Sequence, residues 1–211
     1  MLLRTLRLPI ICLRKPEPDL AHQAQNVLVG THPGSDGSGP VARLFRDDMI
    51  RIERATASSA DAIAHVMRET WDDTYGAYFT VDTLPAARRL WLDALPPESA
   101  LQAPSITFLL AWNDASVLVG FIAVRALRSG DAYVLRLYVR PSDQRCGVGA
   151  ALLGAAIAEV PLAPVIRLDV EVGNKKAVAF WDKNEFRESG RRKETVAGVE
   201  ISLIEMEKHL A

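Results

Sequence analysis

The chain has 211 residues, of which 49% are hydrophobic and 24% are charged, and this composition fits one globular domain with a further segment. Its formal net charge of -1 provides no basic surface, so neither nucleic acid nor an anionic membrane is predicted as a partner. Two cysteines exclude a disulfide framework, no apolar run approaches the ~20 residues that span a bilayer, and we expect a cytoplasmic protein.

The first 48 residues differ in composition from the rest. Five prolines interrupt them, and residues 34–39 are a turn-rich run of glycine, serine and aspartate. Basic residues near the start suggest a targeting peptide, but the apolar stretch beside them contains a proline and is short for a signal. We expect a flexible extension over residues 1–48, or a start placed too early with Met49 as the natural beginning, and a folded domain over residues 49–211.

This domain is predicted to open with a strand and a helix. Residues 50–55 alternate polar and apolar side chains as an edge strand does. Ser58 and Asp61 can form a capping pair at the start of the helix. The apolar face of that helix consists of Ile63, Val66, Met67 and Trp71.

A second helix and a hairpin follow. Residues 84–95 have a helical pattern that ends at Pro96. Strands are predicted over residues 106–112 and 117–127, and Asn113 lies in the turn between them.

The second half of the domain contains a strand-loop-helix unit followed by mixed elements. In order, the predicted elements are a strand over 132–139, a helix over 150–160, a strand over 165–172, a helix over 175–183, and strands over 187–195 and 201–205. Antiparallel hairpins beside a single strand-helix-strand unit predict a mixed α+β sheet and not a doubly wound one.

The loop between the strand and the helix of that unit can bind an anion. It consists of Gln144, Arg145, Cys146, Gly147, Val148, Gly149 and Ala150. The first N-H groups of a helix have no intrahelical acceptor, and the helix dipole places roughly half a positive charge there. Glycine has no Cβ to hold an anion away from the backbone, so the loop predicts a phosphate site.

Two other phosphate motifs are excluded by their spacing. A dinucleotide fingerprint requires a third glycine where this chain has Leu152, and Asp169 lies inside its strand instead of at the strand's end. A P-loop requires Gly-Lys-Ser or Gly-Lys-Thr, which does not occur in the sequence. The four histidines lack ligand spacing, so no metal site is predicted.

The remaining pattern, Gln-x-x-Gly-x-Gly, resembles the coenzyme A pyrophosphate loop of the GNAT superfamily of N-acetyltransferases. Further matches to that superfamily are Leu137, Tyr138 and Val139 before the loop, Asn174 after the next strand, and Phe180, Trp181 and Lys183 in the last helix. The resemblance extends from about Met49 to the C-terminus. It implies a sheet of about six or seven strands with flanking helices, in which the strands 132–139 and 165–172 splay apart.

The resemblance also implies a function and a coenzyme. The chain would be an acyl-CoA-dependent N-acyltransferase that moves acetyl from acetyl-CoA to a primary amine of a small molecule or peptide, acting as a monomer or homodimer. The loop Gln144 to Ala150 would bind the pyrophosphate, and Leu137, Tyr138 and Val139 would hold the thioester. The pantetheine would be flanked by Asn174 and Trp181, and Phe180 and Lys183 would also bind the coenzyme.

The sequence departs from the family at positions that often carry catalysis. Many relatives have a glutamate on the strand before the loop, where this chain has Tyr133 and Leu135. The frequent general acid is a tyrosine at the position of Trp181. A catalytically weak acyl-CoA-binding sensor of the same fold is therefore an alternative, and a nicotinamide oxidoreductase is a third class, which protection by NAD would identify.

The acceptor is expected near Asp72, Asp73 and Tyr75, where relatives receive it between their first two helices, and Tyr138 is the fourth catalytic candidate. Deprotonating a lysine-like amine of pKa ~10.4 at pH 7 costs about 4.6 kcal/mol, whereas an α-amine of pKa ~7.8 costs about 1 kcal/mol. We expect either a low-pKa amine or one deprotonated through water by Asp72, Asp73 or Tyr75. The alternative is that Trp71 and Tyr75 only pack the helix onto the sheet.

Overall fold

The computed structural model describes residues 50–75, 81–82, 85–86, 101, 103–196 and 199–210. The predicted extension over residues 1–48 and most of the predicted helix over 84–95 lie outside the described residues. The domain boundary near Met49 therefore stays a prediction.

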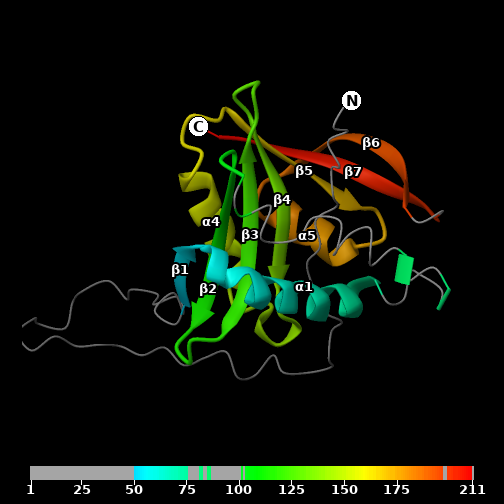
Figure 1. Cartoon of the computed structure of the whole chain (residues 1–211). Coiled ribbons are helices and arrows are strands. Elements are labelled where there is room, and N and C mark those ends of the chain that lie inside the picture. The colour runs from blue at the N-terminus through cyan, green and yellow to red at the C-terminus, as the bar shows by residue number, and fades with distance from the viewer. Residues whose placement is uncertain are drawn as a thin grey trace, which may run out of the picture.

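A seven-stranded mixed sheet forms the centre of the fold, with the strand order β1-β2-β3-β4-β5-β7-β6 (Figure 1). The strands are β1 (Ile50–Arg54), β2 (Ile106–Asn113), β3 (Leu118–Ala126), β4 (Ala132–Val139), β5 (Val165–Glu171), β6 (Arg187–Val196) and β7 (Val199–His209). All neighbours are antiparallel except β4 and β5, which are parallel. This confirms the predicted α+β class and the predicted number of strands.

Helices cover both faces of the sheet. The helical elements are η2 (Ala57–Ser59), α1 (Ala60–Tyr75), η4 (Pro141–Asp143), α4 (Val148–Ala158) and α5 (Lys175–Lys183). Figure 1 shows α1 across one face and α4 and α5 on the opposite face. Within the described residues, no helix is long and apolar enough to span a bilayer.

The α1 face has its own apolar core. Ile63, Val66, Met67 and Trp71 of α1 are all at most 3% exposed, as the predicted apolar face requires. They pack with β-strand residues that include Phe121. Full burial of one such side chain contributes about 1.5–3 kcal/mol, so this face holds α1 firmly on the sheet.

The start of α1 differs from the prediction. A 3-10 turn, η2, precedes the helix, and the N-H of Thr56 donates to Ser59 Oγ at 3.2 Å while the N-H of Ser59 donates to the Thr56 carbonyl at 2.9 Å. The predicted pair of Ser58 and Asp61 was therefore wrong, because the extra turn moves the cap toward the N-terminus.

The opposite face is packed by α4 and α5. Leu152 and Leu153 of α4 and Trp181 of α5 are at most 3% exposed and belong to one cluster with the sheet. The helix α4 begins at Val148 and not at Ala150, because the glycine turn passes directly into it. The strand β7 (Val199–His209) is longer than the predicted range 201–205. Pairing with β5 on one side and β6 on the other extends it through residues in which charged and apolar side chains alternate.

The two central strands part from each other, as predicted. Only Ala132 and Tyr133 of β4 pair with β5, opposite Ile166 and Arg167. Beyond them β4 has a bulge, in which Leu135 is the extra residue relative to β3. A bulge interrupts the ladder and increases the local twist, and Figure 1 shows the C-terminal ends of β4 and β5 diverging.

Candidate active site

The turn before α4 exposes backbone donors. Gly147 is the N-cap of α4 with φ 89°, a left-handed conformation that glycine adopts without strain. Its carbonyl accepts the first helical hydrogen bond, from the N-H of Ala151 at 3.0 Å. The N-H groups of Val148, Gly149 and Ala150 therefore have no intrahelical acceptor and lie at the positive end of the helix dipole.

The two glycines of this turn have different surroundings. A Cβ built on Gly147 would meet no atom within 4 Å, and Arg145, Cys146 and Gly147 are exposed. A Cβ on Gly149 would lie 3.2 Å from Phe180 Cε2. Gly147 thus serves the turn conformation and leaves the turn open, whereas Gly149 lets α4 approach α5 closely.

Side chains attach this turn to the sheet and to α1. Gln144 is buried, and its Nε2 donates to the Val139 carbonyl at 2.9 Å. Arg140 Nε lies 3.2 Å from Glu69 Oε2 of α1, an ion pair without the alignment of a hydrogen bond. The turn is therefore held at the end of β4, next to the point where β4 and β5 have separated.

The predicted thioester residues line the end of β4. Leu137 and Val139 are at most 2% exposed and pack on the α4 side, while Tyr138 is 3% exposed and stacks on Phe121 with ring centroids 5.2 Å apart on the α1 side. None of the three pairs with β5. Buried backbone groups require hydrogen-bond partners, so this edge of β4 is suited to receive an extended ligand.

Burial raises the pKa of Tyr138, and the positive charge of Arg136 only partly offsets this effect. Desolvation also lowers the pKa of Arg136, whose Nη1 donates to Met67 Sδ at 3.4 Å. The phenol of Tyr138 is therefore protonated at neutral pH, and a buried cation lies nearby on the same strand.

The N-cap of α5 contributes an amide donor, and the last turn of the same helix contributes an indole donor. Asn174 Oδ1 accepts from the N-H of Ala177 at 3.1 Å, but Asn174 Nδ2 is buried without a hydrogen-bond partner. Trp181 is fully buried between Phe180 and Phe186, with ring centroids 4.8 and 5.0 Å away, and its Nε1 also lacks a partner. Lys183 is exposed on the last turn.

The predicted acceptor residues are only partly described. Asp72, Asp73 and Tyr75 lie on the last turn of α1, but their side chains are outside the described part of the chain. Trp71 is fully buried in the α1 core, which agrees with the packing alternative for that residue.

Charged residues on the α1 side of the sheet were missed by sequence reasoning. Ile166, Leu168 and Val170 of β5 pack on the α4 side, so the alternate residues of this strand face α1. These alternate residues are Arg167, Asp169 and Glu171. Their regular alternation with apolar residues was the available signal.

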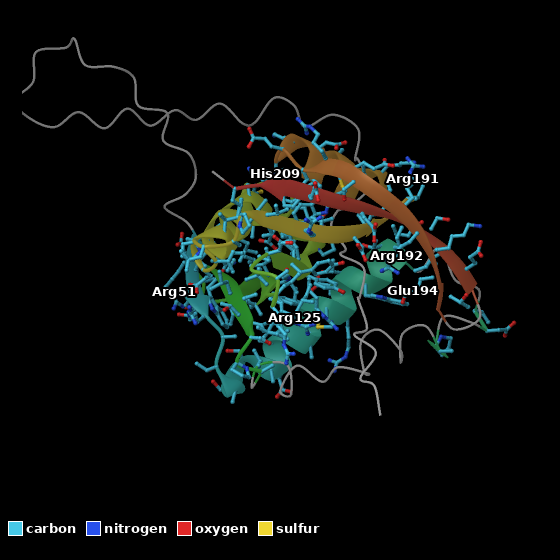
Figure 2. The ribbon with its side chains drawn as sticks, turned by 90° about the horizontal axis from the view of Figure 1, so that it is seen from above. Arg51, Arg125, Arg191, Arg192, Glu194 and His209 are labelled. Atoms are coloured by element: carbon cyan, nitrogen blue, oxygen red, sulfur yellow. The ribbon has the colours of Figure 1, made fainter. Side chains whose placement is uncertain are left out.

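Several of these charges form ion pairs. The buried carboxylate of Asp169 accepts hydrogen bonds from Arg192, which also pairs with Glu194. Burial lowers the pKa of Arg192, but the hydrogen bonds to Asp169 and Glu194 outweigh that effect and raise it above its ordinary value. Figure 2 shows Arg192 and Glu194 pointing from β6 to the α1 side of the sheet. Among the described residues, no group of histidine, cysteine or acidic side chains is arranged to hold a metal ion.

Comparison with known proteins gives one family and a consistent fold. Residues 64–186 match the acetyltransferase (GNAT) family. The chain is 28% identical over 143 residues to the peptidyl-lysine N-acetyltransferase YjaB of Escherichia coli (strain K12), a match that covers 68% of this chain and 86% of that protein.

Two solved structures illustrate the shared fold. The PaiA N-acetyltransferase from Thermoplasma acidophilum, in complex with coenzyme A, has a TM-score of 0.61 and 25% identity over 76% of this chain and 99% of its own. The ribosomal-protein-S18-alanine N-acetyltransferase from Escherichia coli has a TM-score of 0.58 and 17% identity over 77% of this chain and 95% of its own. The second likeness concerns the fold alone.

Proposed function

The chain belongs to the acetyltransferase (GNAT) family, and from this premise we propose that it transfers an acetyl group from acetyl-CoA to a primary amine of a small molecule or peptide. The relative named for peptidyl-lysine and the neighbour solved with coenzyme A support an amine acceptor and a coenzyme A donor. The low cysteine content supports a cytoplasmic site of action.

The observation that carries the proposal is the position of an open helix N-terminus beside two parted strands. The diphosphate of the coenzyme would bind the N-H groups of the turn from Gln144 to Ala150, at the positive end of α4. The pantetheine arm would lie between β4 and β5, where β4 has lost its partner. Asn174 Nδ2, which has no hydrogen-bond partner, would then donate to an acceptor on the coenzyme at one side of this arm.

Transfer to an amine requires stabilisation of the carbonyl oxygen as it becomes negative, and backbone N-H groups near Val139 are suited to that task. It also requires a proton for the departing thiolate. Tyr138 is our candidate donor, because burial keeps its phenol protonated at neutral pH. The indole N-H of Trp181 could donate a hydrogen bond to the thiolate, but an indole does not transfer its proton and so cannot act as the general acid.

The acceptor amine must lose a proton before it can attack. We propose Asp72, Asp73 and Tyr75, at the end of α1, as residues that receive the amine. An α-amine needs about 1 kcal/mol for deprotonation at pH 7 and a lysine side chain about 4.6 kcal/mol, so the nature of the base decides which acceptors are used.

The proposed function is tested by thiol release from acetyl-CoA across a panel of amines. The panel contains an α-amine in a short peptide, a lysine side chain with a blocked α-amine, and a linear polyamine. An acetyltransferase releases free thiol with at least one of them above the rate without amine. A protein of the same fold that only senses the coenzyme would bind acetyl-CoA and release thiol with none, and this result would contradict the proposal.

A further inference from the structure

We propose that Glu171 is the acceptor-side base of this enzyme, which binds a cationic primary amine and accepts a proton from it. This inference rests on the proposed acetyltransferase function and deepens it, because it names the acceptor class. The sequence contains no carboxylate at the places on β4 where relatives carry one, and Glu171 on β5 supplies it from the neighbouring strand.

Glu171 is unusual because one oxygen of its carboxylate, Oε2, is buried without a hydrogen-bond partner. The residue is 8% exposed, and its Oε2 has no hydrogen-bond partner. Glutamate is rarely buried unless it is paired, and a buried carboxylate that makes no hydrogen bond costs free energy. The neighbouring buried acid on the same face, Asp169, has its partner in Arg192. The unused acceptor Oε2 of Glu171 therefore points to a donor that the described part of the chain does not supply.

The position of Glu171 matches the place where the acyl group would react. The last paired residues of the parallel strands are Tyr133 and Arg167. Glu171 lies four residues after Arg167 on β5. On β4, the residue four positions after Tyr133 is Tyr138 when Leu135, the extra residue of the bulge, is not counted. Glu171 is therefore level with Tyr138. Both side chains lie on the α1 side, so the carboxylate lies across the gap from the main chain proposed to hold the thioester.

The charges around Glu171 leave it available for a cation. By strand register, the ionisable groups that share its face are Arg125 on β3, Tyr133, Arg136 and Tyr138 on β4, Arg167 and Asp169 on β5, Arg187, Arg192 and Glu194 on β6, and Glu205 and Glu207 on β7. Arg192 is engaged by Asp169 and Glu194, and Arg167 by Asp131 and Glu207. On α1, Met67 and Trp71 pack on the sheet as apolar side chains, and the described acid Glu69 is engaged by Arg140 at the end of β4.

The proton and bond changes balance as follows. The ammonium gives one proton to Glu171, and the neutral nitrogen forms a bond to the acyl carbon as the bond from that carbon to sulfur breaks. The nitrogen loses its second proton, the thiolate takes up one proton, and one proton leaves to water. A general base of this kind contributes about 100-fold to 10,000-fold to the rate, and it makes an amine of high pKa usable at neutral pH.

The test compares Glu171→Gln with the control Glu188→Gln. Glu188 is an exposed acid of β6 that lies opposite Met206 on β7, and Met206 packs on the α4 side, so Glu188 is on the other face of the sheet from Glu171. Thiol release is measured with acetyl-CoA and the blocked lysine from pH 6.5 to 10. We expect Glu171→Gln to lower kcat/KM at pH 7 by about 100-fold or more. The loss in kcat/KM should shrink toward pH 10, because a larger fraction of the acceptor amine is then already deprotonated in solution. Glu188→Gln should match the wild type throughout.

Folding is controlled separately. The melting temperature of Glu171→Gln should equal or exceed that of the wild type, because the variant removes a buried unpaired charge. If that variant does not fold, Glu171→Asp is measured, which should keep the wild-type dependence on pH with a lower rate.

Two results would overturn the assignment while the wild type remains active. One is a Glu171→Gln variant within 3-fold of the wild type at every pH. The other is a loss that is equal at every pH, which indicates a structural role. A wild type that releases no thiol with any amine would overturn both this inference and the proposed function, and the two failures are thereby distinguished.

Discussion

The two faces of the sheet are built in different ways. On the α4 side, the features that we propose for coenzyme binding belong to the backbone: a left-handed Gly147, the N-H groups that follow it, and a strand edge of β4 that does not pair with β5. On the α1 side they belong to charged side chains such as Asp169, Glu171 and Arg192, brought together from separate strands. A ligand common to a whole family can be bound by the backbone, while an individual acceptor must be recognised by side chains.

The largest expected effect concerns the charged α1 side. Arg192→Met leaves the carboxylate of Asp169, whose side chain is 2% exposed, without its partner. We expect a loss of about 3 kcal/mol in the free energy of unfolding, because a buried charge without compensation is strongly destabilising. Chemical denaturation followed by circular dichroism measures it.

The adjacent residue provides the control for this comparison. Arg191 makes an exposed ion pair with Glu188, and Arg191→Met should leave the unfolding midpoint unchanged. If both variants were equally stable, the α1 side would not depend on its charged pairs, and the contrast between the faces would fail.

The second effect concerns the backbone of the α4 side. In Gly149→Val the new side chain collides with the ring of Phe180, which a Cβ alone would approach to 3.2 Å. The turn is displaced, and we expect the stabilisation by coenzyme A at 100 times its Kd, about 2.7 kcal/mol, to be lost. Thermal unfolding with and without coenzyme A measures this loss. Gly154→Val on the same helix, where no atom lies within 4 Å of the new Cβ, should retain the stabilisation, and a similar loss in both variants would show that the turn is not the binding element.

Much of the α4 side was predictable from the sequence because its signals are local. The spacing of Gly147 and Gly149 after a strand, and of Asn174 before a helix, can be read from neighbouring residues. The pairing of Asp169 with Arg192 on the α1 side was not predicted, because it depends on the position of β7 between β5 and β6. The cap at Thr56 was also missed, since a short 3-10 turn leaves no periodic pattern.

A smaller effect tests the end of α5. Glu185 has φ 69°, a left-handed conformation that favours glycine and costs about 1 kcal/mol or more for other residues. Glu185→Gly should therefore raise the free energy of unfolding by about 1 kcal/mol, less what the exposed pair with Lys208 contributes.

The gain in stability from Glu185→Gly should increase as the pH falls. A hydrogen bond from Lys208 and its positive charge lower the pKa of Glu185, so the pair stabilises the wild type above the ordinary pKa of glutamate and is lost as the pH falls through the lowered pKa. The advantage of Glu185→Gly should grow on acidification, which urea titrations at pH 7 and pH 3 would detect. A smaller advantage at pH 3 would contradict the stabilising pair with Lys208, and no advantage at either pH would contradict the expected strain.

The smallest effect is again on α4. Gly154 is exposed in the interior of the helix, and Gly154→Ala should add about 0.5–1 kcal/mol, because alanine loses less backbone entropy than glycine. Thermal unfolding measures the gain. A loss would mean that this helix face contacts something outside the described chain.

The most direct test of the backbone-built face is a crystal structure of the chain with coenzyme A. We expect the diphosphate within about 3 Å of the N-H groups that follow Arg145 in the turn, and the pantetheine between the separated ends of β4 and β5. A diphosphate bound elsewhere, with this turn empty and the two strands closed on each other, would contradict the account.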